Sequence, residues 1–330
     1  MFVIANHYSP LLLGTSAVYV FFVLSGFWLH TMWTGRYSKA RQPYLTYLVS
    51  RLWRLSPLLL LATAVALIAG PLMGVPVDRM VADGPRLVFS SIFMLGYVWL
   101  HYQPIGPAWT LDIEMQFYLM VPLLSAMVLQ SRRLFVLCAA AGSAFLMWRL
   151  PLHVLPTFAV FFAVGMAAAA SGWRPSRGLA FGTAAALVLA LVLLMISPLA
   201  FLLWGGIGEV ALRRWSTASL AAVALAAVPF AIYTARRPSD ARDRMFGDLS
   251  YIVYLGHWIG VMWLFARPGG WFIDRFAAGE VALPILVPAS WLVWRFYDRP
   301  LERARRRWVE SRLAPRPQPA QYSAAPAPLL

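Results

Sequence analysis

The sequence predicts an all-α protein, a polytopic transmembrane bundle of about ten spans. Of the 330 residues, 61% are hydrophobic and only 12% are charged, whereas a soluble domain carries about 25% charged residues. The charges form short clusters between apolar runs, several of which approach the ~20 residues that one helix needs to cross a bilayer. Backbone in lipid must satisfy its own hydrogen bonds, so only helices or a closed barrel are allowed. Because the runs are continuous rather than alternating, helices are favoured.

The first part of the chain sets the predicted topology. Residues 1–8 have the character of the end of an apolar helix, and a second span is expected over about 13–33. Residues 43–57 carry apolar side chains at helical spacing, which predicts an amphipathic helix along the membrane surface. Pro57 is then expected to start the next span. The loop before it is basic and contains no acid, so the positive-inside rule places it in the cytoplasm; its charges are Arg36, Lys39, Arg41, Arg51 and Arg54.

The rest of the chain continues the same pattern. Arg295 to Arg316 form a second basic cluster, followed by a Pro/Ala-rich segment, 314–330, whose composition predicts disorder. We therefore expect a transmembrane domain over 1–310 and a disordered cytoplasmic tail over 311–330. The remaining apolar runs, some short enough to be broken or re-entrant helices, are 57–75, 87–100, 113–129, 134–148, 154–171, 179–196, 198–211, 217–235, 249–266 and 281–297.

Composition also bears on partners and cofactors. The net charge of +15 is explained by arginines at the ends of spans, so the expected partner is the lipid bilayer and not nucleic acid. A single cysteine, Cys138, implies neither a disulfide framework nor a cysteine metal site. Scattered histidines and few acids predict no metal site of another kind.

Ionisable groups within spans are costly and mark functional sites, and residues 106–124 contain two of them. Asp112 and Glu114 fall just inside an apolar helix, where Glu114 shares a face with Tyr118 by its i, i+4 spacing. Thr110 is expected to cap this helix, and Asp112 is interpreted as a structural first-turn acid facing the helix dipole. Glu114 lies deeper and is the functional candidate.

Two other features have both a structural and a functional interpretation. His7 is either an interfacial histidine or a catalytic group, and His257, beside Trp258, equally fits an aromatic belt. Arg51 and Arg54 are either membrane anchors or a phosphate site, because arginine forks match phosphate oxygens. The residues alone leave these alternatives open.

Taken together, several stretches resemble one family, the membrane acyltransferase-3 proteins, which O-acylate bacterial glycans, antibiotics and other acceptors. Each stretch is weak alone, but their order and spacing are specific, and they extend from residue 7 to about 302. They are His7, 21-FFVLSGF-27, 51-RLWRLSP-57, 109-WTLDIEMQFYLMVPLL-124, 250-SYIVYLGHW-258 and 297-YDRPLE-302.

The resemblance implies roles for individual residues. His7 matches the general base, Glu114 matches the family's acid, and Arg51 with Arg54 match an Arg-x-x-Arg that handles acyl-CoA, typically acetyl-CoA. No bound cofactor is implied. The family has an arginine well before its histidine, whereas only six residues precede His7; since so short a span cannot cross a bilayer, we expect a truncated start. Residues expected to support the acceptor or the structure are Ser25, Trp109, Thr110, Tyr118, Tyr254 and His257.

The sequence thus predicts a multi-pass protein of the bacterial inner membrane that transfers an acyl group, acetyl in the first instance, from acyl-CoA to a hydroxyl. The acceptor is a glycan or another envelope or secondary-metabolite molecule. Glu114 is expected to orient His7 or stabilise its imidazolium. Direct attack is the simpler route, although acylation of a histidine leaves a covalent relay open. The alternatives are a glycan or lipid transporter or flippase, which would consume no acetyl-CoA, and an envelope scaffold, in which neither His7 nor Glu114 would matter.

Overall fold

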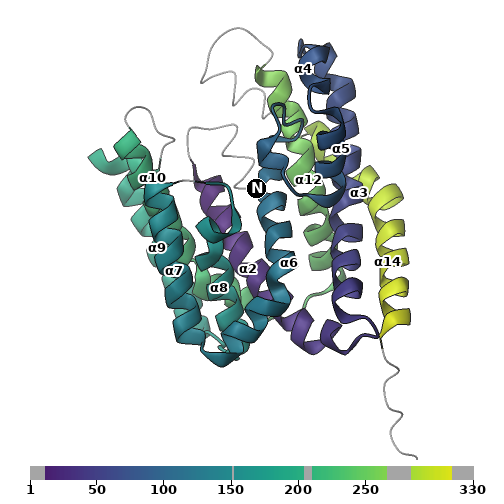
Figure 1. The fold of residues 1–330 in the computed structure, drawn as a ribbon. Coiled ribbons are helices and arrows are strands. Elements are labelled where there is room, and N and C mark those ends of the chain that lie inside the picture. The colour runs from purple at the N-terminus through teal and green to yellow at the C-terminus, as the bar shows by residue number, and fades with distance from the viewer. Residues whose placement is uncertain (1–11, 151, 204–209, 266–283, 314–330) are drawn as a thin grey trace, which may run out of the picture.

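The computed structural model describes residues 12–150, 152–203, 210–265 and 284–313, and within these ranges the chain is helical with no strand. The helices form a bundle whose long members run alongside one another (Figure 1). This confirms the all-α prediction. The predicted tail over 311–330 lies almost entirely outside the described residues.

Length and composition identify four helices in the described ranges that can cross a membrane. They are α2 (Leu13–Gly35), α3 (Pro43–Leu72), α6 (Trp109–Gln130) and α9 (Arg177–Met195). A fifth arises if α10 (Val210–Ala226) and α11 (Val228–Ala235), bent by 41° at their junction, are taken as one broken span. About ten spans is therefore not confirmed. The other long helices are α7 (Arg132–Arg149), α8 (Leu155–Ala170), α12 (Ala241–Phe265) and α14 (Arg299–Arg312).

Two local predictions are wrong. Residues 43–57 do not form a separate surface helix, because α3 runs through Pro57 as one helix of 30 residues. Proline is tolerated inside membrane helices, where neighbouring groups satisfy the freed backbone. The run 87–100 is not a span either: α5 (Gly84–Phe93) ends at Met94, whose φ of 53° is left-handed, and a 3₁₀ turn follows.

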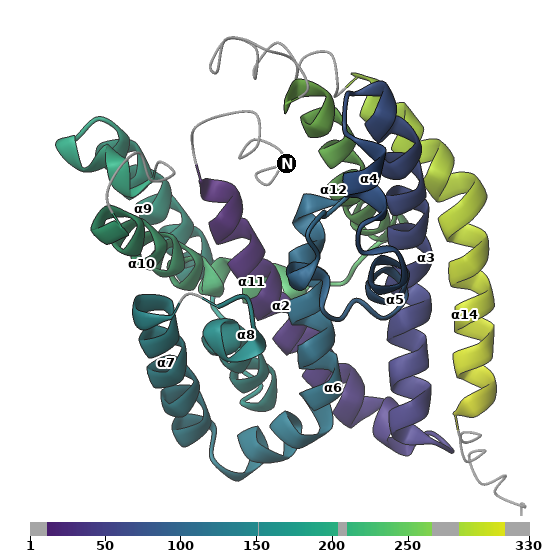
Figure 2. The ribbon, with the colours of Figure 1, turned by 45° about the horizontal axis from the view of Figure 1, so that its top comes forward.

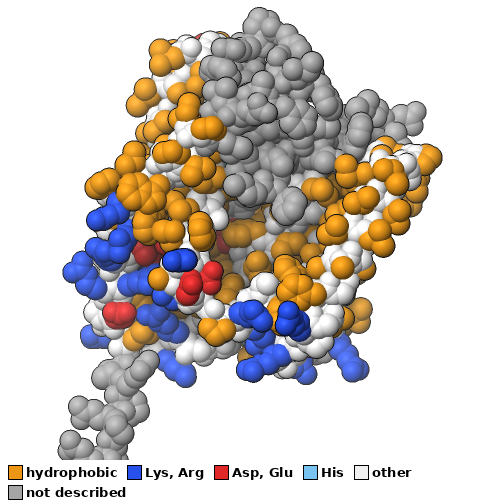
Figure 3. Space-filling model, turned by 180° about the vertical axis from the view of Figure 1, so that it is seen from behind, with side chains coloured by type: hydrophobic (Ala, Val, Ile, Leu, Met, Phe, Trp, Pro, Cys, Tyr) orange, Lys and Arg blue, Asp and Glu red, His pale blue; other side chains and the backbone are white. Residues whose placement is uncertain are grey.

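Basic side chains gather at one end of the bundle, below walls that are largely hydrophobic (Figure 3). The two basic clusters of the sequence meet there. The Arg41 amide donates to the Arg312 carbonyl at 3.0 Å, and Arg312 Nη1 donates to Gln42 Oε1 at 3.1 Å. The start of α3 and the end of α14 thus lie together at the end that the positive-inside rule assigns to the cytoplasm.

Helix α2 lies between α8 and α6 (Figure 2), and two glycines bring it very close to α8. A Cβ built on Gly26 would lie 2.2 Å from the Phe162 carbonyl oxygen, and one on Gly165 would lie 1.9 Å from that of Val23. Small residues permit such close backbone approach between membrane helices. This contact explains the glycine of 21-FFVLSGF-27 and turns Ser25, its neighbour, toward α6.

Candidate functional site

A buried carboxyl lies at the centre of the site. Glu114 sits in the second turn of α6 with only 3% of its surface exposed. Its Oε1 accepts a hydrogen bond from Ser25 Oγ at 2.9 Å and a second from the Tyr118 hydroxyl. Oε2 is buried and has no hydrogen-bond partner among the described residues. Buried polar atoms are nearly always paired. We therefore expect this oxygen to bind a substrate or a group outside the described ranges.

Arg51 approaches this carboxyl from α3. Its Nη2 donates to the Tyr37 hydroxyl at 3.1 Å, and the guanidinium also lies over the Tyr37 ring, 5.7 Å from the centroid. The Arg51 charge is close enough to interact electrostatically with Glu114. The Tyr37 hydroxyl also lies 2.8 Å from Ser50 Oγ, so Ser50 and Arg51 of α3 both contact the 3₁₀ turn Tyr37–Lys39 that follows α2.

Arg54, one turn further along α3, contacts other helices. Its Nη2 lies 2.6 Å from Asp248 Oδ1 on α12, and its Nη1 lies 3.5 Å from Glu302 Oε2 on α14. The side chain is 24% exposed, so the ion pairs are partly shielded from water. The two arginines of the Arg-x-x-Arg motif therefore do not form a single fork: Arg51 faces the Glu114 region and Arg54 faces the packing of α12 and α14.

Glu302 forms ion pairs with several arginines at the basic end. Arg305 donates to both of its oxygens at 2.6 and 2.7 Å, and Arg306 donates at 2.6 Å. Burial alone would raise the pKa of Glu302, but the hydrogen bonds and charges of these arginines, with Arg54, lower it to about 2. Arg305 also donates to Ser50 Oγ at 2.5 Å, which joins the Arg54 and Arg51 sides in one network.

Sequence reasoning missed the acids and the third arginine of this network. Glu302 ends the family-like stretch 297-YDRPLE-302 and Asp248 lies two residues before 250-SYIVYLGHW-258, yet neither acid was assigned a role. The available signal was that acids are scarce in this chain. In the sequence, Asp248 lies 194 positions after Arg54 and Glu302 lies 248 positions after it. No local pattern reveals pairs so far apart.

A cavity of about 480 Å³ opens beside this network. Asp248 and Glu302 contribute to its wall, but five arginines outnumber these two carboxylates. Phosphate oxygens bind well to such arginine clusters. The arginines come from the start of α12 and from α14; they are Arg242, Arg244, Arg299, Arg303 and Arg306.

The predicted cap at Thr110 is wrong. Helix α6 follows a 3₁₀ turn, and its N-cap, Ala108, makes no side-chain cap bond. Thr110 Oγ1 instead lies 2.7 Å from the Tyr254 hydroxyl, and both hydroxyls donate toward the Pro107 carbonyl, at 3.0 and 2.8 Å. These contacts tie α12 to the start of α6, so Thr110 and Tyr254 support the structure beside Glu114.

The neighbouring predicted residues also have defined surroundings. Asp112 accepts from the Val98 amide at 3.2 Å and from Gln116 Nε2 at 3.0 Å, which agrees with a structural role. Trp109 packs edge-on against the His153 ring at 5.0 Å. His257 is buried, with Nδ1 3.3 Å from the Val253 carbonyl oxygen, and it is one of the residues that line an apolar cavity.

His7 lies outside the described residues, as do Tyr8 and Ser9. Its predicted contact with Glu114 stays a prediction. Of the predicted site, the structure brings together Ser25, Glu114, Tyr118 and Arg51, and places Arg54 in a separate cluster.

Apolar helices of spanning length, with a buried polar cluster among them, define a helical membrane protein. A family model described as an acyltransferase domain matches residues 1–295. The chain therefore belongs to the acyltransferase-3 family, as its motifs indicated, and is a membrane acyltransferase. Neither curated proteins nor solved structures give a significant match.

Proposed function

We propose that the protein transfers an acyl group from acyl-CoA, with acetyl as the donor group that the family resemblance implies, to a hydroxyl of a glycan or another envelope or secondary-metabolite acceptor. The proposed setting is the bacterial inner membrane. The observation that supports a reaction centre is the Glu114 carboxyl. Ser25 and Tyr118 hold one of its oxygens, while the other has no hydrogen-bond partner among the described residues. A buried acceptor fixed in this way is suited to orienting a base.

The proposed reaction is a single displacement. Neutral His7 takes the proton of the acceptor hydroxyl as its oxygen attacks the thioester carbonyl carbon. The new C–O bond forms, the C–S bond breaks, and the imidazolium returns its proton to the departing thiolate. Glu114 Oε2 accepts the other imidazole N–H, which fixes the ring and stabilises its positive charge. Acylation of His7 itself is the covalent version of the same scheme.

The donor is proposed to enter at the basic end. The arginine-lined cavity beside Arg54 has the charge to bind the phosphates of CoA. Arg54 is already paired with Asp248 and Glu302, and Arg306 is paired with Glu302. We therefore assign both to holding the cavity wall, and assign phosphate binding mainly to the other four arginines of the lining, Arg242, Arg244, Arg299 and Arg303. This end is the cytoplasmic one by the positive-inside rule, where acyl-CoA is available.

The test uses membranes that contain the protein, ¹⁴C-acetyl-CoA and the native envelope fraction as acceptor. Wild type should label the acceptor and release CoA, while His7→Ala and Glu114→Gln should lose most of both. Asp243→Asn, an exposed carboxyl at the start of α12, is the matched control and should stay active. Labelling by His7→Ala at the wild-type rate would overturn the proposed base, and labelling without CoA release would overturn the donor. Mass analysis of surface glycans with and without the gene would identify the acceptor.

A further inference from the structure

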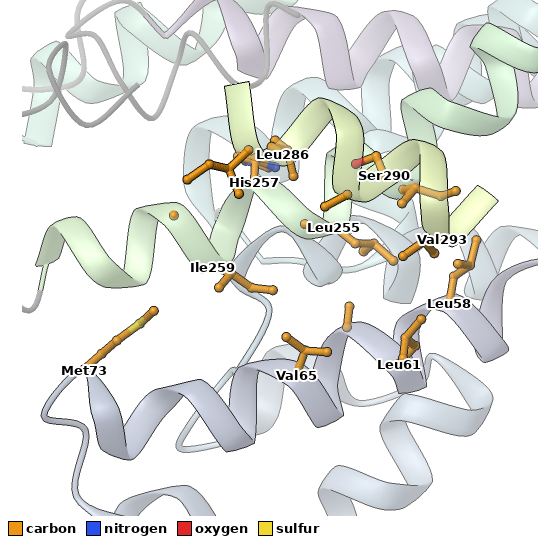
Figure 4. A pocket seen from close by; sticks show the side chains of 16 residues that line it. Leu58, Leu61, Val65, Met73, Leu255, His257, Ile259, Leu286, Ser290 and Val293 are labelled. Carbon is orange, nitrogen blue, oxygen red and sulfur yellow. The ribbon is translucent and has the colours of Figure 1, made fainter. Parts of the chain in front are cut away.

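A large apolar cavity lies among three helices: α3, α12 and the helical segment 284–293 that precedes α14 (Figure 4). Its volume is about 610 Å³, within the ~300–1,000 Å³ typical of small-molecule sites. Sixteen of the described residues line it, and among these only His257 and Ser290 have polar side chains. A cavity so poor in hydrogen-bonding groups is suited to an apolar ligand.

The apolar cavity is lined by the helix faces that carry Arg54 and Asp248, and Asp248 is also part of the wall of the arginine-lined cavity. On α3, Leu58, Leu61 and Val65 follow Arg54 at steps of three and four residues, which places them on one face. On α12, Ile252 and Leu255 follow Asp248 at the same spacing.

On the helical segment that precedes α14, two adjacent residues line the two different cavities. Trp294 lines the arginine-rich cavity, and Val293 lines the apolar one. An arginine-lined cavity on α12 and α14 and an apolar cavity on α3, α12 and segment 284–293 are thus lined by successive stretches of the same helices.

We propose that the apolar cavity holds the alkyl chain of a medium- or long-chain acyl-CoA whose phosphates bind in the arginine-lined cavity. This inference rests on the proposed acyl-CoA-dependent function and names its donor class, extending it beyond acetyl. An acyl-CoA carries phosphates that suit the arginine-lined cavity and an alkyl chain that suits the apolar one, and the pantetheine arm that joins these groups would lie outside the apolar lining.

Size and chemistry favour an alkyl chain over other parts of the donor. The lining on α12 runs from Ile252 to Gly260, about 12 Å at 1.5 Å per residue, close to the ~15 Å of hydrocarbon in one leaflet. The volume is roughly four times that of a ~150 Å³ apolar cavity that binds one benzene. The pantetheine amides would find almost no partners here, and unpaired amides are costly to bury. A sugar would be disfavoured for the same reason.

The test measures binding with purified protein in lipid nanodiscs. Acetyl-, butyryl-, hexanoyl- and octanoyl-CoA compete against ³H-CoA. Each fully buried CH₂ should tighten binding by about fourfold at 25 °C, so we expect octanoyl-CoA to bind at least ~100-fold more tightly than acetyl-CoA. Affinities that do not rise with chain length would overturn the inference.

Two substitutions locate the chain. Ala62→Phe places a ring in the cavity and should remove most of the octanoyl gain while leaving acetyl-CoA affinity unchanged. Ala64→Phe, on the exposed side of α3, is the matched control and should keep the gain. Gly260→Leu fills the cavity from α12 and serves if Ala62→Phe does not fold. A gain that survives both cavity substitutions would overturn the inference, as it would place the chain elsewhere.

A bilayer lipid tail is the other candidate occupant, and it gives a different result. It would make binding independent of acyl length, which overturns the inference. Failure of the proposed function is separate, because it would appear as absence of CoA release from every donor in the transfer assay, whatever the binding profile. Arg242→Gln, in the arginine-lined cavity, should weaken CoA and all acyl-CoAs by the same factor and leave the increment per CH₂ intact.

Discussion

Replacing Glu114 with glutamine tests the reaction centre with little structural change. The glutamine carbonyl can occupy the position of Oε1 and still accept hydrogen bonds from Ser25 and Tyr118. Its NH₂ then takes the place of Oε2. The open, buried position changes from an acceptor to a donor, so it can no longer receive an imidazole N–H from His7.

The effects on stability and on catalysis should differ in size. Hydrogen bonds to a charged group contribute about 1.5–3 kcal/mol each, against about 1 kcal/mol for neutral pairs. Weakening two bonds without breaking either therefore costs at most a few kcal/mol. Losing the orientation of a general base typically lowers the rate by about 10²–10⁴-fold, and a base held in the wrong tautomer costs about 10⁴-fold. We expect kcat to fall within that range while the protein stays folded.

The assay pairs acyl transfer with thermal unfolding of the same preparation. Asp243→Asn controls for loss of an exposed carboxyl. Ser25→Ala and Tyr118→Phe each remove one donor to Oε1 but keep the carboxyl, so each should cost roughly tenfold and alter the pH profile of kcat, a readout that a purely structural role would leave unchanged. Glu114→Gln with a folded transition and more than a tenth of wild-type kcat would refute the role of the open oxygen.

Three further predictions concern stability. Gly165→Ala drives a Cβ into the Val23 carbonyl oxygen and should destabilise the bundle by about 1–3 kcal/mol, whereas Gly182→Ala, which meets nothing within 4 Å, should be neutral or stabilise by about 0.4–1 kcal/mol; equal melting temperatures would contradict the close helix contact. Glu302, with its pKa lowered to about 2, contributes stability that is complete above about pH 4.5 and is lost as the pH falls toward 2, so Glu302→Gln should flatten the acid limb of the melting curve. Asp298 has the opposite sign: burial, with repulsion from nearby acids, raises its pKa to about 6 against the pull of Arg54. Its ionisation therefore opposes folding as the pH rises from about 4 to 6, and Asp298→Asn should raise the melting temperature at pH 7 but not at pH 4; a gain at both would contradict the assigned pKa.

The all-α fold class could be predicted from the sequence because apolar runs are local signals, and the rarity of intramembrane acids made Glu114 a candidate for function. Glu114 was distinguished from Asp112 by depth alone, and the structure gives Asp112 two structural partners. The helix break at Pro57 was a wrong prediction because proline ends helices in water, whereas a membrane helix has no better alternative for its backbone than to continue.

The partners of these residues could not be predicted locally. The contact between Ser25 and Glu114 spans 89 positions, and that between Arg54 and Asp248 spans 194. Thr110 had the residue type of a cap, but a 3₁₀ turn brought its hydroxyl to Tyr254 instead. The apolar cavity had no signal, since its lining has the same composition as any lipid-facing or core surface of the chain.

The geometry of α3 explains how an Arg-x-x-Arg motif can serve two places at once. Residues three apart on a helix are displaced by about 60° around its axis, so Arg51 and Arg54 lie close along α3 yet face different neighbours. Arg51 contacts Tyr37 in the 3₁₀ turn after α2 and lies close enough to Glu114 to interact with it electrostatically, while Arg54 forms ion pairs with the acids of α12 and α14. Arg305 joins these two sets of contacts, because it donates hydrogen bonds both to Glu302 and to Ser50 Oγ. A donor bound among the arginines of α14 would therefore contact the same hydrogen-bond network that supports Arg51. Helix α3 would in this way connect donor binding with the carboxyl proposed to orient the base.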